Sequence, residues 1–304
     1  MVEENSKIVY VLMGPTGSGK TYLTEFLNPD LFEVVSCDSR QVYREMPLGT
    51  AVPDEKTKKR IRHHLIECIN PDQSLDASDY SRLAKEKIQE IFQKNKKPII
   101  IGGTGFYYMS LKTEAFEAPA NHEIRKYLLT LELEEKRKLL HKEDPGVLVN
   151  PGETTGAGRI HPNDDYRITR ALEIILSTGV PWSEHWRKKT LAQNTGEYTY
   201  SGWYISVELE SYKKRVFERA EQMIASGFLQ EAERIAEKYG EDCPGLRSLG
   251  YKEALDAARG LISMDQFLEI LGNLHYQYGR KQRTWFKREK ELKGVTLEEL
   301  TEIF

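Results

Sequence analysis

The sequence lacks several features that would assign it to a specialised class of protein. No apolar run is long enough to cross a bilayer, so we expect no membrane partner. Its three cysteines, Cys37, Cys68 and Cys243, lie too far apart for a metal-ligand motif, and we expect free thiols. The acidic first five residues do not have the pattern of a signal peptide. We therefore expect a cytoplasmic globular protein, and the absence of a coiled-coil pattern favours a monomer.

A large excess of charge of one sign is also absent. The 304 residues include 44 basic and 47 acidic side chains, which gives a net charge of −3. This balance does not indicate a nucleic-acid partner, but phosphate contacts depend on where charge lies rather than on its sum. The length fits one large α/β domain or a core that carries an insertion.

The most informative segment is GPTGSGKT, residues 14–21, which has the full spacing of a phosphate-binding loop, or P-loop. It follows an apolar run at residues 8–13, and we expect a helix to begin near Lys20. The glycines let several N–H groups face one concavity, and the helix N-terminus adds positive potential. Lys20 brings a mobile charge, and Thr21 brings a hydroxyl suited to Mg²⁺. The predicted ligands of a diphosphate or polyphosphate are Gly14, Thr16, Gly17, Ser18, Gly19, Lys20 and Thr21.

Two further strands are predicted to end near this loop. The apolar run at 31–36 ends before Asp38, and the run at 98–101 ends at Gly102-Gly103-Thr104. A helical pattern at 78–95 separates them. Alternation of strands and helices predicts a parallel sheet flanked by helices, the P-loop NTPase-like α/β architecture. Because ligands of such sheets bind beyond the carboxyl ends of the strands, we expect the three strand ends to form one site.

The composition changes between residues 113 and 200, where charged helical segments alternate with loops rich in Gly, Pro and Asn. We predict a mainly helical insertion there. The core would then comprise residues 1–112 and 201–304, with a last strand at 203–207 and helices over 210–240, 250–258, 264–285 and 296–304.

The strand at 98–101 does not end in a carboxylate, which argues against a nucleotide-hydrolysing motor or switch but leaves a small-molecule kinase open. Asp38 is the remaining strand-end carboxylate. Its local sequence fits a magnesium ligand, a general base or a helix N-cap. Residues 102–104 fit either a simple tight turn or hydrogen-bond donors facing a reaction centre.

Seven segments together resemble one family, the tRNA dimethylallyltransferases, also called tRNA isopentenyltransferases, of bacterial type. They occur in the family's order and cover nearly the whole chain. They are GPTGSGKT (14–21), SCDSRQVYREMPLGTA (36–51), HHL (63–65), PIIIGGTGFYY (98–108), RIHPND with YRITRALE (159–164 and 166–173), GYKE (250–253) and RKQRTWF (280–286).

The resemblance implies a reaction. A dimethylallyl group moves from dimethylallyl diphosphate to the exocyclic amine of the adenosine on the 3′ side of the tRNA anticodon. The P-loop, with Mg²⁺ on Thr21, would hold the diphosphate that leaves, and Arg215 would lie near it. Asp38 would accept a proton from the amine or orient it, and Thr104 would hydrogen-bond near the same amine. These two residues are the predicted catalytic pair.

The resemblance also implies that the insertion grips the anticodon stem-loop, from which the base swings out. Arg167 and Arg170 share one helical face and could reach one RNA strand, although ion pairs with Asp164 or Glu173 are the alternative. The basic run from Arg280 suits RNA backbone contact. The predicted tRNA-binding residues are Asp38, Ser39, Arg40, Gln41, Thr104, Arg125, Tyr166, Arg167, Ile168, Thr169, Arg170, Arg280, Lys281 and Arg283.

Other notable side chains have ordinary structural interpretations. We expect His63 and His64 to pack in a loop rather than bind metal, Trp182 and Trp186 to pack the insertion, and Trp285 with Phe286 to be core residues. Cys37 and the loose segment 152–158 depart from the family's usual pattern.

Three other functions remain as alternatives. A transferase acting on free adenine nucleotides would share the P-loop but would not need the insertion or the basic C-terminal stretch. A P-loop kinase is disfavoured by the Asp38 and Gly-Gly-Thr pattern. A non-catalytic RNA-binding protein is disfavoured because Lys20, Thr21, Asp38 and Thr104 are all present.

Overall fold

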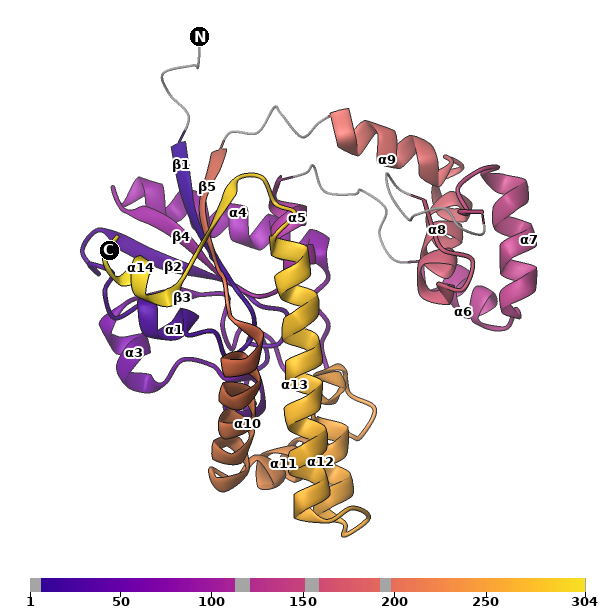
Figure 1. The fold of residues 1–304 in the computed structure, drawn as a ribbon. Helices are drawn as coiled ribbons and strands as arrows, with labels where there is room; N and C mark the ends of the chain where they lie inside the picture. Colours follow the sequence, from indigo (N-terminus) through magenta and orange to yellow (C-terminus); the bar gives the residue numbers. More distant parts are fainter. Residues whose placement is uncertain (1–6, 113–120, 151–158, 192–197, 304) are drawn as a thin grey trace. The chain divides into compact units, whose positions relative to one another are not determined.

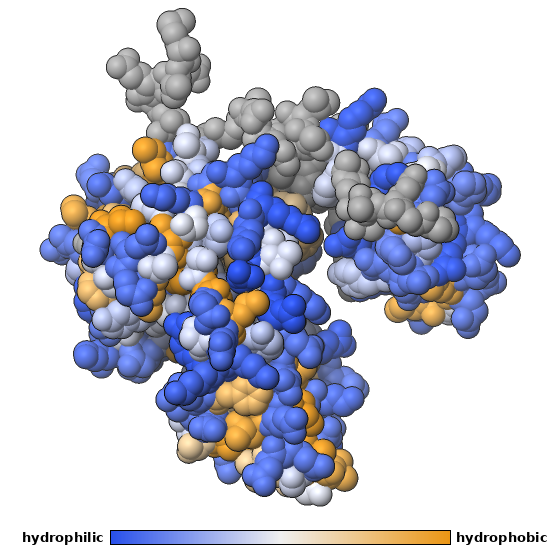
Figure 2. All heavy atoms as spheres, in the orientation of Figure 1, coloured by the Kyte–Doolittle hydropathy of each residue, from blue (hydrophilic) through white to orange (hydrophobic). Residues whose placement is uncertain are grey.

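The computed structural model describes residues 7–112, 121–150, 159–191 and 198–303 (Figure 1). The chain divides into two compact units. Unit 1 combines Met1–Leu111 with Glu197–Phe304, and unit 2 is the continuous segment Lys112–Gly196, which overlaps the predicted insertion closely. Within the described ranges, no helix is long and apolar enough to span a membrane. Hydrophilic residues dominate the face drawn in Figure 2.

A six-stranded sheet forms the centre of unit 1. Its order is β3-β2-β4-β1-β5-β6, and each neighbouring pair is parallel. The strands are β1 (Lys7–Met13), β2 (Phe32–Cys37), β3 (His63–His64), β4 (Lys97–Gly102), β5 (Tyr198–Ile205) and β6 (Leu292–Val295). The predicted parallel sheet, and with it the P-loop NTPase-like α/β class, is confirmed.

The central strands are continuously apolar because both faces of the sheet are covered. Successive side chains of a strand point to opposite faces. In β1, Val9 and Val11 belong to the core on one face, whereas Leu12 belongs to the core on the other. In β4, Ile100 joins the first core and Ile99 joins the second.

Helices surround the sheet (Figure 1), and their apolar side chains supply the other half of each core. α4 contributes Tyr80, Ala84 and Ile88 on one face, and α10 contributes Tyr212 and Val216 on the other. The helices of unit 1 are α1 (Lys20–Leu23), α2 (Pro47–Thr50), α3 (Glu55–Arg60), α4 (Ala77–Gln93), α5 (Gly105–Lys112), α10 (Leu209–Ala225), α11 (Phe228–Tyr239), the 3₁₀ helix η2 (Pro244–Arg247), α12 (Tyr251–Ala258), α13 (Met264–Phe286) and α14 (Leu297–Thr301).

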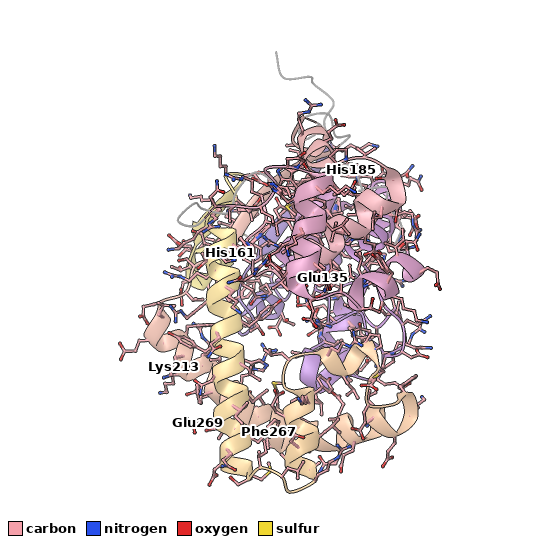
Figure 3. The ribbon with its side chains drawn as sticks, turned by 90° about the vertical axis from the view of Figure 1, so that its right-hand side faces the viewer. Glu135, His161, His185, Lys213, Phe267 and Glu269 are labelled. Carbon is pink, nitrogen blue, oxygen red and sulfur yellow. The ribbon has the colours of Figure 1, made fainter. Side chains whose placement is uncertain are left out.

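The longest of these helices, α13, begins with a capping box in which Ser263 and Gln266 exchange hydrogen bonds with each other's backbone. Figure 3 shows its whole length, with Phe267 and Glu269 near its start. Phe267 is fully buried in a third core, which also holds the segment after β2 through Val42 and Met46.

A buried carboxylate fixes that segment to the C-terminal helices. Glu231 on α11 is 2% exposed and accepts hydrogen bonds from the amides of Leu48 and Gly49, at 3.0 and 2.9 Å, and from the hydroxyl of Tyr251 at 2.6 Å. Buried carboxylates are stable only when their oxygens are satisfied in this way. The chain that leaves the carboxyl end of β2 is therefore held rigidly.

Unit 2 has its own small core. It consists of α6 (His122–Leu129), α7 (Leu133–Glu143), α8 (Asp165–Thr178) and α9 (Trp182–Leu191). Leu128, Leu140 and Leu172 are fully buried in one cluster, against which Trp182 packs. The ring centroids of Trp182 and Trp186 lie 6.2 Å apart, so the expected core packing is confirmed for Trp182, and Trp186 contacts the ring of Trp182. The loose segment 152–158 lies outside the described residues.

The structure corrects several predicted boundaries. β3 and β6 were not predicted, and β5 begins at Tyr198 rather than at 203, so the predicted boundary at 200 falls inside a strand. The helical stretch 210–240 is two helices, because Gly227 between them has the left-handed φ of 99°. α1 spans only four residues.

Candidate active site

The carboxyl ends of β1, β2 and β4 lie level with one another. Met13 and Cys37 are both in register with Gly102. The amide of Gly14 donates to the carbonyl of Gly102, and the amide of Gly103 donates to the carbonyl of Cys37, each at 3.1 Å. Only glycine fits at position 102, since an added Cβ would lie 2.0 Å from the Cys37 carbonyl oxygen. The predicted convergence of the three strand ends is confirmed.

The P-loop has the expected curled backbone. Gly17 and Gly19 have φ angles of 71° and 95°, in the left-handed region that favours glycine. Among the described residues, neither of their amides has a hydrogen-bond acceptor, so both are available to an anion. The predicted helix contribution is smaller than expected, because α1 has four residues and a short helix carries a weak dipole.

Lys20 is folded back over the loop that precedes it. Its Nζ donates to the carbonyls of Gly14 and Pro15, at 2.9 and 2.7 Å. Burial lowers the pKa of Lys20 to about 8, against the opposing effect of the nearby Asp38 carboxylate. No carboxylate of the described residues pairs with this ammonium group. A cation held this way, without a counterion, favours an anionic ligand.

A second cation at the loop is Arg219 on α10, which the sequence analysis missed. A Cβ placed on Gly17 would lie 3.8 Å from both Cδ and Nη1 of Arg219. Burial lowers the pKa of Arg219, whereas Tyr212 and Asp38 raise it. Within the described ranges it has neither an ion-pair nor a hydrogen-bond partner.

Arg215, the residue predicted for this role, lies one turn earlier on α10. The guanidinium of Arg215 interacts electrostatically with Tyr212 and Glu298. The helical spacing of Tyr212, Arg215 and Arg219 puts all three on one face, which is the signal that could have indicated Arg219.

Two helices hold the middle of the P-loop through Thr16. The hydroxyl of Tyr212 donates to the carbonyl of Thr16 at 2.8 Å, and the amide of Thr16 donates to Oε1 of Gln282 at 2.8 Å. Both backbone groups of Thr16 are thus occupied, and its predicted diphosphate contact would have to come from its hydroxyl. Ser18 is fully buried and its amide donates to the carbonyl of Pro15 at 3.2 Å, so it shapes the loop from inside.

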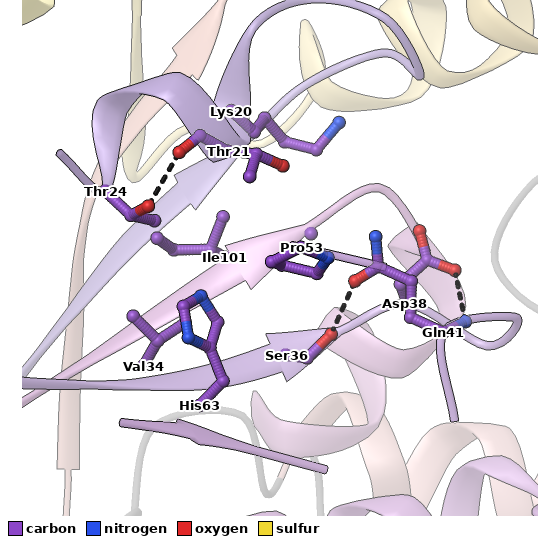
Figure 4. A pocket seen from close by; sticks show the side chains of 11 residues that line it. Lys20, Thr21, Thr24, Val34, Ser36, Asp38, Gln41, Pro53, His63 and Ile101 are labelled. Carbon is purple, nitrogen blue, oxygen red and sulfur yellow. Dashed lines mark hydrogen bonds between the residues drawn. The ribbon is translucent and has the colours of Figure 1, made fainter. Parts of the chain in front are cut away.

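The acceptor side of the site is the turn after β2. Oδ1 of Asp38 accepts from the amide of Arg40 at 2.9 Å and from the amide of Gln41 at 3.4 Å. Asp38 therefore closes a turn, and the helix N-cap alternative is wrong. Oδ2 has no hydrogen-bond donor within the described part of the chain. Asp38 lines one pocket with Lys20 and Thr21 of the P-loop (Figure 4).

Thr104 ties a second turn to the first. Its Oγ1 accepts from the amide of Ser39 at 3.0 Å and donates to Ser39 Oγ at 3.3 Å. Tyr278 on α13, which sequence analysis did not single out, lies beside Thr104 and Asp38. Burial and the Asp38 carboxylate together raise the pKa of Tyr278 to about 12. The side-chain amide of Gln41 accepts a hydrogen bond from the hydroxyl of Ser36 and donates one to the carbonyl of Ala51, so it stabilises the turn.

The prediction that His63 and His64 pack in a loop is wrong, because these two residues form strand β3 beside β2. His64 Nε2 lies 2.7 Å from Oε2 of Glu33, and His63 Nδ1 lies 2.9 Å from the carbonyl of Ile61. In the described ranges, no three His, Cys, Asp or Glu side chains are grouped to hold a metal ion. The cysteines are free thiols, as predicted.

In unit 2, the predicted tRNA contacts fall into exposed and buried sets. Arg125 on α6 and Tyr166 on α8 are exposed, Tyr166 by 70%. Ile168 is fully buried in the unit's core and Thr169 is 7% exposed, so these two side chains belong to the interior and not to an RNA-facing surface.

The ion pairs considered as the alternative for the two arginines of α8 are present. Arg167 Nε lies 3.3 Å from Asp164 Oδ2, and both side chains are accessible to solvent. Arg170 Nη1 lies 3.0 Å from Oε2 of the buried Glu173. An exposed pair is weak and can open for another anion, whereas a pair with a buried carboxylate is costly to break. Arg167 is therefore the better candidate for RNA contact.

In α13, Arg280 and Lys281 are exposed and Arg283 is partly buried. The guanidinium of Arg280 lies over the ring of Tyr276, 5.8 Å from its centroid. Trp285 and Phe286 pack in the core on the α4 face, as expected.

A P-loop sequence and an Asp–Thr pair at the carboxyl edge of a parallel sheet define the class of this protein, an α/β protein of the P-loop NTPase-like fold. Comparison with known proteins gives the family. Residues 41–289 match the IPP transferase family. A tRNA dimethylallyltransferase of Leptospira interrogans is 38% identical over 301 residues, 97% of each chain. One from Koribacter versatilis is 32% identical over 95% of this chain and 92% of its own.

The solved structures agree with this assignment. A tRNA delta(2)-isopentenylpyrophosphate transferase from Staphylococcus epidermidis has a TM-score of 0.68 at 29% identity, with 98% of both chains covered. A eukaryotic dimethylallyltransferase acting on tRNA, 23% identical, shares the fold with a TM-score of 0.81 over 96% of this chain and 74% of its own. The chain belongs to the tRNA dimethylallyltransferase (IPP transferase) family.

Proposed function

We propose that this enzyme transfers a dimethylallyl group from dimethylallyl diphosphate to the N6 amine of the adenosine 3′-adjacent to the anticodon in tRNA, and releases diphosphate. One observation carries the proposal. Lys20 and Thr21 of the P-loop share a pocket with Asp38, so a diphosphate site and a proton acceptor face the same space (Figure 4).

The donor half of the site is suited to a leaving diphosphate. The bond between the allylic carbon and its oxygen breaks, and the electron pair stays on that oxygen. Lys20 and Arg219, both without a carboxylate partner among the described residues, would stabilise the negative charge that develops there. The amides of Gly17 and Gly19 would add two fixed donors.

The acceptor half would receive the adenine amine. The nitrogen lone pair forms the new bond to the allylic carbon, and the amine proton moves to Oδ2 of Asp38. Oδ1 is already fixed by the Arg40 amide, so the carboxylate would keep its orientation during the transfer. Thr104 would fix the same turn through Ser39 and lie close to the incoming base.

These residues fit a magnesium ion that is shared between the protein and the substrate. A site with a threonine hydroxyl and one carboxylate, and no group of three side-chain ligands in the described ranges, matches a cation that keeps water and binds substrate phosphates. Thr21 would hold it, and when bound it would neutralise charge on the diphosphate.

The tRNA would meet basic residues of both units. In unit 2 these are Arg125 and Arg167, and the exposed ring of Tyr166 is next to Arg167 in the sequence. In unit 1 they are Arg280 and Lys281 on α13. Since one chain supplies every group invoked, we propose that it acts as a monomer.

Product analysis tests this proposal. The protein is incubated with unmodified tRNA, dimethylallyl diphosphate and Mg²⁺, and a nucleoside digest is analysed by mass spectrometry. We expect one dimethylallyladenosine for each diphosphate released, and loss of both when a chelator is added. ATP consumption with a phosphorylated product and no dimethylallyladenosine would instead establish the kinase alternative.

A further inference from the structure

The side chain of Gln282 joins the two halves of the site. It lies on α13, is 6% exposed, and its amide group makes two hydrogen bonds to backbone atoms far away in the sequence. Its Oε1 accepts from the amide of Thr16 in the P-loop at 2.8 Å. Its Nε2 donates to the carbonyl of Gly103, in the turn after β4, at 2.8 Å. One planar group therefore spans the donor loop and the turn that leads to Thr104.

From Gly103 the connection continues to the catalytic carboxylate. The amides of Gly103 and Thr104 both donate to the carbonyl of Cys37 at 3.1 Å. Thr104 then accepts from the amide of Ser39, the residue after Asp38. A shift of the Gly103 carbonyl would therefore be passed to the turn that holds Asp38.

The packing around this amide leaves no room for adjustment. A Cβ on Gly103 would lie 2.4 Å from Nε2 of Gln282, and a Cβ on Gly105 would lie 2.4 Å from the ring of Trp285. One turn earlier, a Cβ on Gly279 would lie 1.7 Å from the hydroxyl of Tyr212, which itself holds Thr16. α13 thus packs closely against the turn after β4 and against Tyr212 of α10, and glycines at 103, 105 and 279 allow that approach.

We propose that Gln282 is a positioning residue that sets the separation between the diphosphate of the donor and the amine of the acceptor. This inference rests on the proposed function. An amide suits the task because it accepts from one loop and donates to the other with the same rigid group. A carboxylate can only accept, and it can replace the amide only when it is protonated. A thioether cannot donate and is only a weak acceptor.

The test compares Gln282→Met and Gln282→Glu with Gln277→Met and Gln277→Glu, which make the same changes at an exposed position of the same helix. For Gln282→Met we expect kcat to fall about 100-fold, because misplacement of reacting groups mainly slows the chemical step. The KM for the donor should rise about tenfold as the P-loop loses its hydrogen bond to Gln282, and the KM for tRNA should change less than about threefold. The Gln277 variants should match the wild type.

The pH profile of Gln282→Glu distinguishes positioning from a merely structural role. A carboxyl group buried at this position has a raised pKa. Relative to the wild type at each pH, we expect the variant to lose about 100-fold in kcat at pH 8.5 and to recover most of that loss near pH 6, as the acid form donates to Gly103 again. A ratio that stays constant across this range would overturn the proposal. Because the change is followed within one folded protein, the test holds even if Gln282→Met does not fold.

Binding of inorganic diphosphate separates this inference from the proposed function. If the wild type transfers no dimethylallyl group, the proposed function fails, and the Gln282 inference is judged by calorimetric titration with diphosphate and Mg²⁺. Loss of the hydrogen bond to Thr16 should weaken binding by about tenfold in Gln282→Met relative to Gln277→Met. Equal affinities of the two variants would contradict the role of Gln282 in ordering the P-loop.

Discussion

The hydroxyl oxygen of Thr104 lies 3.0 Å from the amide nitrogen of Ser39 and accepts a hydrogen bond from it. This bond joins the turns after β4 and β2, which lie 65 residues apart in the sequence. The bond from Thr104 holds the backbone next to Asp38 by a contact with another turn. Oδ1 of Asp38 holds the same backbone by a contact within its own turn, with the amide of Arg40. The proton acceptor of the proposed reaction is therefore held by two independent contacts.

The first prediction concerns Asp38. Asp38→Asn keeps an oxygen that can accept from the Arg40 amide, so the turn should survive, but the side chain can no longer take a proton. We expect the single-turnover rate to fall by about two to four orders of magnitude, the usual span for loss of a general base. Asp38→Ala should fall at least as far. A near-normal rate in the asparagine variant would remove Asp38 from proton transfer.

The second prediction compares two arginines of α10. Arg219 lies against Gly17 of the P-loop and has no hydrogen-bond or ion-pair partner in the described ranges, whereas Arg215 interacts with the carboxylate of Glu298. Loss of a hydrogen bond to a charged group costs about 1.5–3 kcal/mol, so Arg219→Ala should lower kcat/KM for dimethylallyl diphosphate by about 10- to 100-fold. Arg215→Ala should change it less than about threefold. A larger effect of Arg215→Ala than of Arg219→Ala would instead support Arg215, the residue that the sequence analysis placed near the diphosphate.

The third prediction is a pH dependence that arises from Lys20. Its pKa is lowered to about 8, so the free enzyme loses this charge as the pH rises through that value. We expect kcat/KM for the donor to fall about tenfold per pH unit above pH 8. Lys20→Arg, which stays charged, should be slower at neutral pH but should lack this descending limb. If Lys20→Arg shows the same fall in kcat/KM above pH 8, that fall arises from another group.

The same pKa shift predicts a trend in stability. The unfolded chain holds the Lys20 proton up to its ordinary pKa of 10.5, whereas the folded protein releases it near 8. The unfolded state thus binds more protons between these values, and this residue's contribution makes the free energy of unfolding increase with pH in that window. Lys20→Met should remove the increase in a denaturant titration series.

The fourth prediction concerns tRNA binding by unit 2. Arg167 is exposed and its pair with Asp164 is weak, so its guanidinium is free to exchange one anion for another. Arg167→Ala should raise the KM for tRNA about 3- to 10-fold and leave the KM for the donor unchanged. Lys142→Ala removes an exposed cation from α7 of the same unit and serves as the control. An effect confined to the donor would contradict an RNA role for Arg167.

The sequence predicted strands and the loops after them best where the pattern was both local and apolar. β1 and β4 contain continuous apolar runs, β1 is followed by Gly14 and β4 ends at Gly102, so the position of the P-loop and of the Gly-Gly-Thr turn followed directly. β3 has two residues and β6 has four with a lysine and a glycine, and neither carries a strand pattern.

The site residues that sequence missed depend on packing between distant segments. Gln282 stands in a basic helical stretch and has the pattern of a solvated face, and its burial arises only because α13 rests on Gly103. The choice between Arg215 and Arg219 depends on how α10 is rotated, which Tyr212 and Val216 fix by packing in the core. Ile168 fits an RNA-contact motif in sequence, but its neighbours in unit 2 enclose it.

The most direct test of the central claim compares two acceptors in one experiment. The protein is incubated with labelled dimethylallyl diphosphate and Mg²⁺, with either an unmodified anticodon stem-loop or free AMP. The proposed function predicts label in the stem-loop alone, because the basic surfaces of both units would serve an RNA. Label in AMP alone would contradict it and assign the chain to a transferase of free adenine nucleotides.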